Sequence, residues 1–155
     1  MFKAKLVVLA VAMMCCMGAH AGNKVSCQPA AEASRSLVVA FYKQALVDKQ
    51  PRAAFERYVS ADFIEHKPDV PDGTRTATVK FLDDLIKELP DARWEILRTV
   101  AEQDLVFLHA RFFPAAGAAP YAIADLFRVK DGVIVEHWDV VAPHRDGQPN
   151  PNSRF

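Results

Sequence analysis

The chain has 155 residues, with 19 basic and 19 acidic side chains and a formal net charge of zero. This length accommodates one ordinary domain with its own core, and the balanced charge, without a basic stripe, argues against nucleic-acid binding. Of the three cysteines, only Cys27 lies outside the apolar N-terminal segment, so no disulfide is expected within the domain.

The N-terminus has the pattern of a cleavable export signal. A short basic region precedes an apolar stretch over residues 6–18, which is too short to cross a bilayer comfortably, and residues 19–21 (Ala-His-Ala) fit the small-x-small cleavage pattern. We therefore predict a signal peptide over residues 1–21, and a periplasmic or secreted protein that starts at Gly22 and has no stable membrane association. A retained anchor is the alternative.

The first half of the remaining chain is predicted to be helical. After a flexible lead over residues 22–33, apolar residues recur with helical spacing in two segments, and a proline at position 51 favours the first turn of a short helix between them. The predicted helices cover residues 37–46, 52–58 and 76–89, with an extended segment over 60–66 and a proline-rich loop over 68–73.

The second half is predicted to consist of β-strands. Four runs rich in β-branched and aromatic residues are separated by turn-length gaps, so consecutive strands are expected to pair antiparallel; they cover residues 94–101, 105–113, 121–129 and 133–141. Helices followed by a strand meander predict a single α+β domain over residues 34–142, in which the helices cover one face of a curved sheet. An irregular tail is expected over residues 143–155.

The strand that begins at Tyr121 contains the first candidate site residue. Because successive strand residues point to opposite faces, Asp125 shares its face with large apolar side chains such as Ile123 and Phe127. A buried carboxylate must be hydrogen-bonded, protonated or functional, since removing its charge from water is costly. Asp125 is therefore either a general base in a pocket, or a carboxylate satisfied by the backbone or by a neighbouring arginine.

Two residues of the preceding strand are possible partners of Asp125. A hairpin could place His109 beside Asp125, although a lone histidine on an apolar strand is often a satisfied core residue. Arg111 shares the face of His109 and could instead form the ion pair with Asp125, which would make that carboxylate a poor base.

Further polar residues are expected around the pocket. His66 precedes the proline-rich loop and is placed at the pocket rim, where it either orients a substrate or anchors the loop through the backbone. Trp138 is expected to line the pocket with its indole N–H available to a ligand. His137 and Asp139 share a face, and such a pair can ligate iron, but the sequence offers no convincing third ligand, so no metal is predicted.

Several segments resemble the SnoaL-like polyketide cyclase branch of the nuclear transport factor 2-like superfamily. They are FIEHKPDVPDG (63–73), DLVFLHARF (104–112), DLFRVKDGVIVEHWDVV (125–141) and the closing PNSRF (151–155). The resemblance implies a cone in which three N-terminal helices pack on a curved, mostly antiparallel sheet that encloses a mostly apolar pocket. It also implies that Asp125 is the catalytic residue and that His109 assists it.

The favoured function is a cofactor-independent cyclase or isomerase that abstracts a proton beside a carbonyl group in an apolar small molecule. Phe63, Tyr121 and Arg111 are expected to contact that molecule, together with His66 and Trp138. The chain has no nucleotide-binding loop and no nucleophilic serine elbow. A non-catalytic binding or dimerisation module is the alternative. A homodimer is also expected, because the strands over 105–113 and 133–141 carry apolar residues on both faces.

Overall fold

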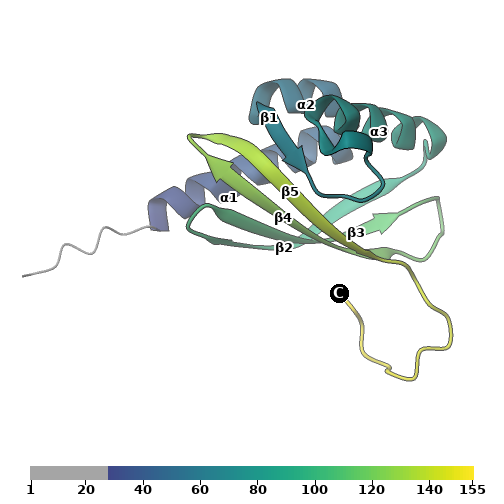
Figure 1. Cartoon of the computed structure of the whole chain (residues 1–155). Helices are drawn as coiled ribbons and strands as arrows, with labels where there is room; N and C mark the ends of the chain where they lie inside the picture. Colours follow the sequence, from purple (N-terminus) through teal and green to yellow (C-terminus); the bar gives the residue numbers. More distant parts are fainter. Residues whose placement is uncertain (1–27) are drawn as a thin grey trace, which may run out of the picture.

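A computed structural model describes residues 28–155 of the chain (Figure 1). Its elements, in chain order, are α1 (Gln28–Tyr42), η1 (Lys43–Val47), α2 (Pro51–Tyr58), β1 (Val59–Glu65), η2 (Pro71–Gly73), α3 (Arg75–Glu88), β2 (Arg93–Glu102), β3 (Leu105–Phe113), β4 (Tyr121–Lys130) and β5 (Val133–Ala142). Three helices pack on one face of a five-stranded sheet, which confirms the predicted α+β class.

The strand order in the sheet is β1-β5-β4-β3-β2. The strands from β2 to β5 form the predicted antiparallel meander, whereas β1 joins the edge of the sheet parallel to β5. The chain between β1 and β5 runs through α3 and the whole meander, which is the long connection that a parallel pair requires. This pairing places Glu65 beside His137 in the register.

Helix α1 begins at Gln28, inside the segment over 22–33 that the sequence predicted to be a flexible lead. Three alanines follow within the next five residues, and alanine has the highest helix propensity. One of them, Ala31, is buried and anchors this end of the helix. The rest of the lead, the predicted signal peptide and Cys27 lie outside the described residues. No helix in residues 28–155 is long and apolar enough to cross a membrane.

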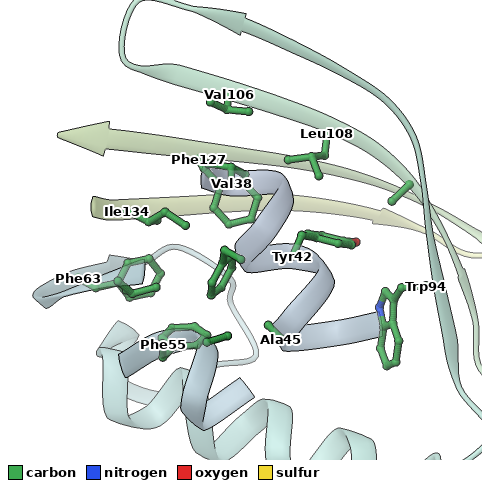
Figure 2. Packing of buried hydrophobic residues seen from close by; sticks show 14 of the residues in the cluster. Val38, Tyr42, Ala45, Phe55, Phe63, Trp94, Val106, Leu108, Phe127 and Ile134 are labelled. Carbon is green, nitrogen blue, oxygen red and sulfur yellow. The ribbon is translucent and has the colours of Figure 1, made fainter. Parts of the chain in front are cut away.

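The hydrophobic core fills the space between the helices and the inner face of the sheet (Figure 2). Val38 of α1 faces Leu108 of β3 and Ile134 of β5, and all three side chains are fully buried. Phe41 makes edge-to-face contacts with Phe55, at 5.2 Å between ring centroids, and with Phe127, at 5.8 Å. These contacts fix α1 and α2 over the sheet and set the shape of the space beneath them.

The outer face of the sheet carries both apolar and charged side chains. Val100, Phe107 and Val140 are exposed there. The tail over 143–155 has no helix or strand, and it returns so that Phe155 stacks on His109 at 6.1 Å between ring centroids (Figure 1). The homodimer expected through this face stays a prediction.

Candidate active site

A cavity of about 270 Å³ lies between the inner face of the sheet and the helices. It is roughly twice the size of a cavity of about 150 Å³ that accommodates benzene, so it suits a ligand of one or two rings. The wall is mostly apolar, and nine of its residues are aromatic: Phe41, Tyr42, Phe55, Phe63, Phe81, Trp94, Phe112, Tyr121 and Phe127. The expected apolar pocket is therefore present, and Phe63 and Tyr121 are among its lining residues. Their contact with a substrate stays a prediction.

Asp125 projects from β4 into this cavity. The residue is only 5% exposed, as the alternation of β4 predicts. Its Oδ1 lies 3.2 Å from Nε2 of His137. Its Oδ2 is buried and has no hydrogen-bond partner among the described residues. Because an unsatisfied carboxylate oxygen is costly to bury, this atom is the place where a ligand gains most from contact with the protein.

His137 connects two buried carboxylates from neighbouring strands. Its Nδ1 lies 2.8 Å from Oε1 of Glu65, and its Nε2 faces Asp125. Burial by itself lowers the pKa of His137, but hydrogen bonds and charge interactions with Asp125 and Glu65 outweigh it and raise the pKa to about 9. At neutral pH the ring is therefore an imidazolium that donates one N–H to each carboxylate.

The position of Glu65 depends on the backbone around it. Oε1 of Glu65 also accepts a hydrogen bond from the backbone N–H of Lys67, at 3.0 Å. Gly73 packs directly against the carbonyl oxygen of Glu65, and a Cβ at position 73 would lie 2.6 Å from that oxygen. Gly73 also has a φ of +56°, which disfavours other residues. The η2 turn thus holds the end of β1 in place.

Replacing Gly73 by alanine is expected to destabilise the protein by about 2–3 kcal/mol, because strain at positive φ adds to the clash with Glu65. Gly132→Ala is a matched control: Gly132 also has a positive φ, but nothing lies within 4 Å of an added Cβ. We expect the control to lose only about 1 kcal/mol. Urea denaturation of both variants measures the difference, and equal losses would show that the contact with Glu65 is unimportant.

A second polar group lines the same cavity. Asp139 is the cross-strand neighbour of Asp125, and its Oδ2 lies 2.8 Å from Nζ of Lys67. The same Nζ lies 3.3 Å from the carboxylate of Asp69. Burial lowers the pKa of Lys67, but the two carboxylates raise it above its usual value overall. Lys67 is therefore a cation shared by two acidic residues.

Tyr42 of α1 completes the polar part of the cavity. Its side chain is fully buried, and burial, the charge of Asp125 and a hydrogen-bond interaction with that carboxylate raise the pKa of the phenol well above its usual value. The phenol is therefore neutral at physiological pH and retains its proton. Tyr42 belongs to the apolar stripe of α1, where the sequence offered no sign that its hydroxyl faces polar groups.

The predicted partnership of Asp125 and His109 is wrong in geometry. The residue of β3 opposite Asp125 in the register is Leu108, so His109 points to the outer face of the sheet. Burial and the nearby Arg98 lower the pKa of His109. Apolar residues occur on both faces of β3, so the sequence alone did not show which face carries the core.

Three other expected pocket residues also lie on the outer face. Arg111 forms an ion pair with Glu95, at 2.9 Å, rather than with Asp125. His66 stacks on Trp138 with 4.6 Å between ring centroids, and its Nε2 lies 2.9 Å from Glu136. Strand alternation explains all three positions, because each neighbours a residue that faces the cavity.

The residues that sequence reasoning missed are His137 and Glu65. The alternation of β5 had placed His137 and Asp139 on one face, and both line the cavity. Their pattern was considered only for metal binding. Within residues 28–155, no group of three or more histidine, cysteine, aspartate or glutamate side chains is arranged to hold a metal ion. The sequence signal for His137 was its place, with Asp139, on one face of a strand next to the strand of Asp125.

Comparisons with known proteins agree with this architecture. The SnoaL-like domain model matches residues 38–137. No curated protein sequence matches the chain. Solved structures with the same fold include a candidate polyketide cyclase of Bacillus cereus, which is 20% identical with a TM-score of 0.63 over 74% of this chain and 77% of that one.

Two further structures show the range of proteins with this fold. AclR, a candidate hydroxylase of Streptomyces galilaeus, is 22% identical, with a TM-score of 0.60 over 72% of this chain and 80% of that one. A nuclear transport factor 2-like protein of unknown function from Mesorhizobium loti is 23% identical, with a TM-score of 0.59 over 73% and 93%. These likenesses establish the fold, and the domain match covers most of the described residues. The chain belongs to the SnoaL-like domain family and has the fold of nuclear transport factor 2-like proteins.

Proposed function

We propose that this protein is a cofactor-independent enzyme of the cyclase or isomerase type, which abstracts a proton beside a carbonyl group in a small, mostly apolar molecule. The main support is Oδ2 of Asp125, a carboxylate oxygen that is buried without a partner in an aromatic cavity. The cavity leaves room for a substrate beside this oxygen, so a C–H bond of the substrate can lie within its reach.

In this mechanism Oδ2 of Asp125 accepts the proton from the carbon next to the carbonyl group. The electron pair of the broken C–H bond forms a carbon–carbon double bond, and the carbonyl oxygen becomes an enolate oxygen. In the proposal, the neutral phenol of Tyr42, which interacts with Asp125 in the free protein, donates a hydrogen bond to that oxygen when the substrate is bound. The carboxylic acid of Asp125 then returns a proton to a carbon of the enolate, so no cofactor is consumed. In D₂O the acid proton exchanges with solvent before this return, and the ketone gains deuterium.

His137 and Glu65 have a positioning role in the proposal. The imidazolium N–H at Nε2 holds Oδ1 of Asp125, which leaves Oδ2 directed at the substrate. Glu65 fixes the orientation of the ring from the opposite side, through Nδ1. A base held in this way loses little entropy when the substrate binds, because its rotamer is already set.

The proposal is tested by proton exchange, which needs no knowledge of the natural product. Cyclic ketones of one and two rings are incubated with the protein in D₂O, and NMR follows the replacement of their α-protons by deuterium. We expect exchange above the buffer rate for ketones that enter the cavity. Ketones that bind without any added exchange would favour the alternative, a non-catalytic binding module, which the aromatic wall also supports.

We also propose that the protein is exported and acts in the periplasm or outside the cell. The basic region, the short apolar stretch and the Ala-His-Ala segment support this proposal. N-terminal sequencing of the protein recovered from the periplasm or the medium should begin at Gly22. Recovery of the full-length chain from the cytoplasm alone would contradict it.

A further inference from the structure

The charges that line the cavity do not balance. Among the described residues, its charged lining consists of four carboxylates and two cations: Glu65, Asp69, Asp125 and Asp139 against Lys67 and His137. His137 lies between Glu65 and Asp125, and Lys67 lies between Asp69 and Asp139. Each of these two groups therefore has one more negative charge than positive charge. An excess of negative charge is present in either protonation state of His137, because a neutral imidazole would only increase it.

The excess negative charge has its strongest effect in the buried group of Glu65, His137 and Asp125. Asp69 is exposed at the mouth, where solvent screens its charge. Glu65 and Asp125 are both buried, and only His137 lies between them. A charge that protein atoms shield from solvent in this way acts strongly on anything bound beside it. Oδ2 of Asp125 is also unpartnered, which is an independent sign that this group is completed by a ligand.

The aromatic residues of the wall also favour a positively charged ligand. Phe41 and Phe63 are among the rings that line the cavity, and aromatic rings attract cations through the negative side of their quadrupole. An anion in the same place would lack this attraction and would be repelled by the unbalanced carboxylates. The cavity therefore combines an apolar surface for a ring with an electrostatic preference for positive charge.

We infer that the cavity selects ligands that carry a positive charge, and that the substrate is a ring-bearing carbonyl compound with a protonated amino group. The inference rests on the proposed function for the carbonyl group, and adds the charge of the substrate. The ammonium group offsets the excess carboxylate charge, while the ring occupies the aromatic part of the cavity. Anionic substrates are excluded by the same charges.

Three probes with one ring and nearly equal size test the charge preference: 2-phenylethylamine, 2-phenylethanol and phenylacetate. Calorimetric titration at pH 7 and low salt should show the amine binding at least about tenfold more tightly than the alcohol, and the alcohol more tightly than the carboxylate. Equal or tighter binding of phenylacetate would overturn the inference, and so would an amine that fails to bind at millimolar concentration.

Two variants locate the origin of the preference. Asp125→Asn and Asp139→Asn each remove one negative charge without changing the size of the side chain, so each should lower the ratio of amine to alcohol affinity about three- to tenfold. Asp91→Asn, which removes an exposed carboxylate outside the cavity, should keep the wild-type ratio. Unchanged ratios in both cavity variants would contradict the inference. If neither variant folds, the three probes on the wild-type protein still decide.

The exchange assay separates this inference from the proposed function. Exchange of neutral ketones together with equal affinity for the three probes would leave the enzyme proposal intact and remove the charge preference. Tight binding of the amine without exchange of any ketone, amino-substituted ketones included, would leave a cation-binding cavity and remove the chemistry.

Discussion

Asp125→Asn is expected to lower the rate of α-proton exchange by a factor on the order of 10² to 10⁴. The amide has the shape of the carboxylate but cannot accept the proton as a base. Its carbonyl oxygen can still accept the hydrogen bond from Nε2 of His137, so the side chain should keep its position. We therefore expect the affinity for neutral ketones to change little, whereas the melting temperature should fall because the charge interaction of Asp125 with His137 is lost. NMR exchange rates at saturating ketone measure the effect.

His109→Gln is the matched control for this experiment. His109 is the histidine that sequence reasoning assigned to the site, yet it points away from the cavity on the outer face of the sheet. We expect its replacement to leave exchange at the wild-type rate. A loss in the His109 variant as large as that in the Asp125 variant would contradict the site derived from the structure. Full activity of Asp125→Asn would refute the catalytic role of this carboxylate.

The free energy of unfolding is expected to fall by about 3 kcal/mol as the pH rises from about 6.5 to above 9. Burial disfavours the charged form of His137, but its interactions with Asp125 and Glu65 outweigh burial and raise its pKa from 6.5 to about 9. A group whose pKa is higher in the folded state stabilises the fold fully below its unfolded pKa. This contribution is lost as the pH rises through the folded value.

Two histidine variants test the pH dependence by urea denaturation at a series of pH values. In His137→Gln the free energy of unfolding should change less with pH between about 6.5 and 9, because the neutral amide has no proton to lose. The variant should also be less stable than the wild type at pH 6. His144→Gln removes a histidine from the tail, where it contacts Asp146, and should keep the wild-type slope. A steep slope that persists in His137→Gln would exclude the imidazolium between the two carboxylates.

The order of the elements and the inner face of β4 could be predicted from the sequence. Helical spacing identified three helices, and regular alternation in β4 placed Asp125 on one face with Ile123 and Phe127. Both patterns are local, because the side chains of a helix or a strand repeat with a fixed period. The family resemblance pointed to the same architecture, which the domain match and the related structures support, and to an apolar pocket, which the cavity in this structure supports.

The partners of Asp125 were decided by tertiary structure. His109 and Arg111 were plausible because β3 is apolar on both faces, and only the register with β4 shows that Leu108 faces the cavity instead. A shift of one residue would reverse this result, since neighbouring strand residues point to opposite sides. The sequence does not encode that register in any local pattern.

The contact between Glu65 and His137, which are far apart in the sequence, could not be predicted from local patterns either. They come together because β1 pairs parallel with β5, far along the chain, at the edge of the sheet. Such a pairing depends on how α3 and the meander pack, and no periodicity within either strand reveals it. By itself, the sequence determined which residues could be buried on each element. The tertiary structure decided which buried charges meet, because the energy of a buried charge depends on partners that only the packed fold supplies.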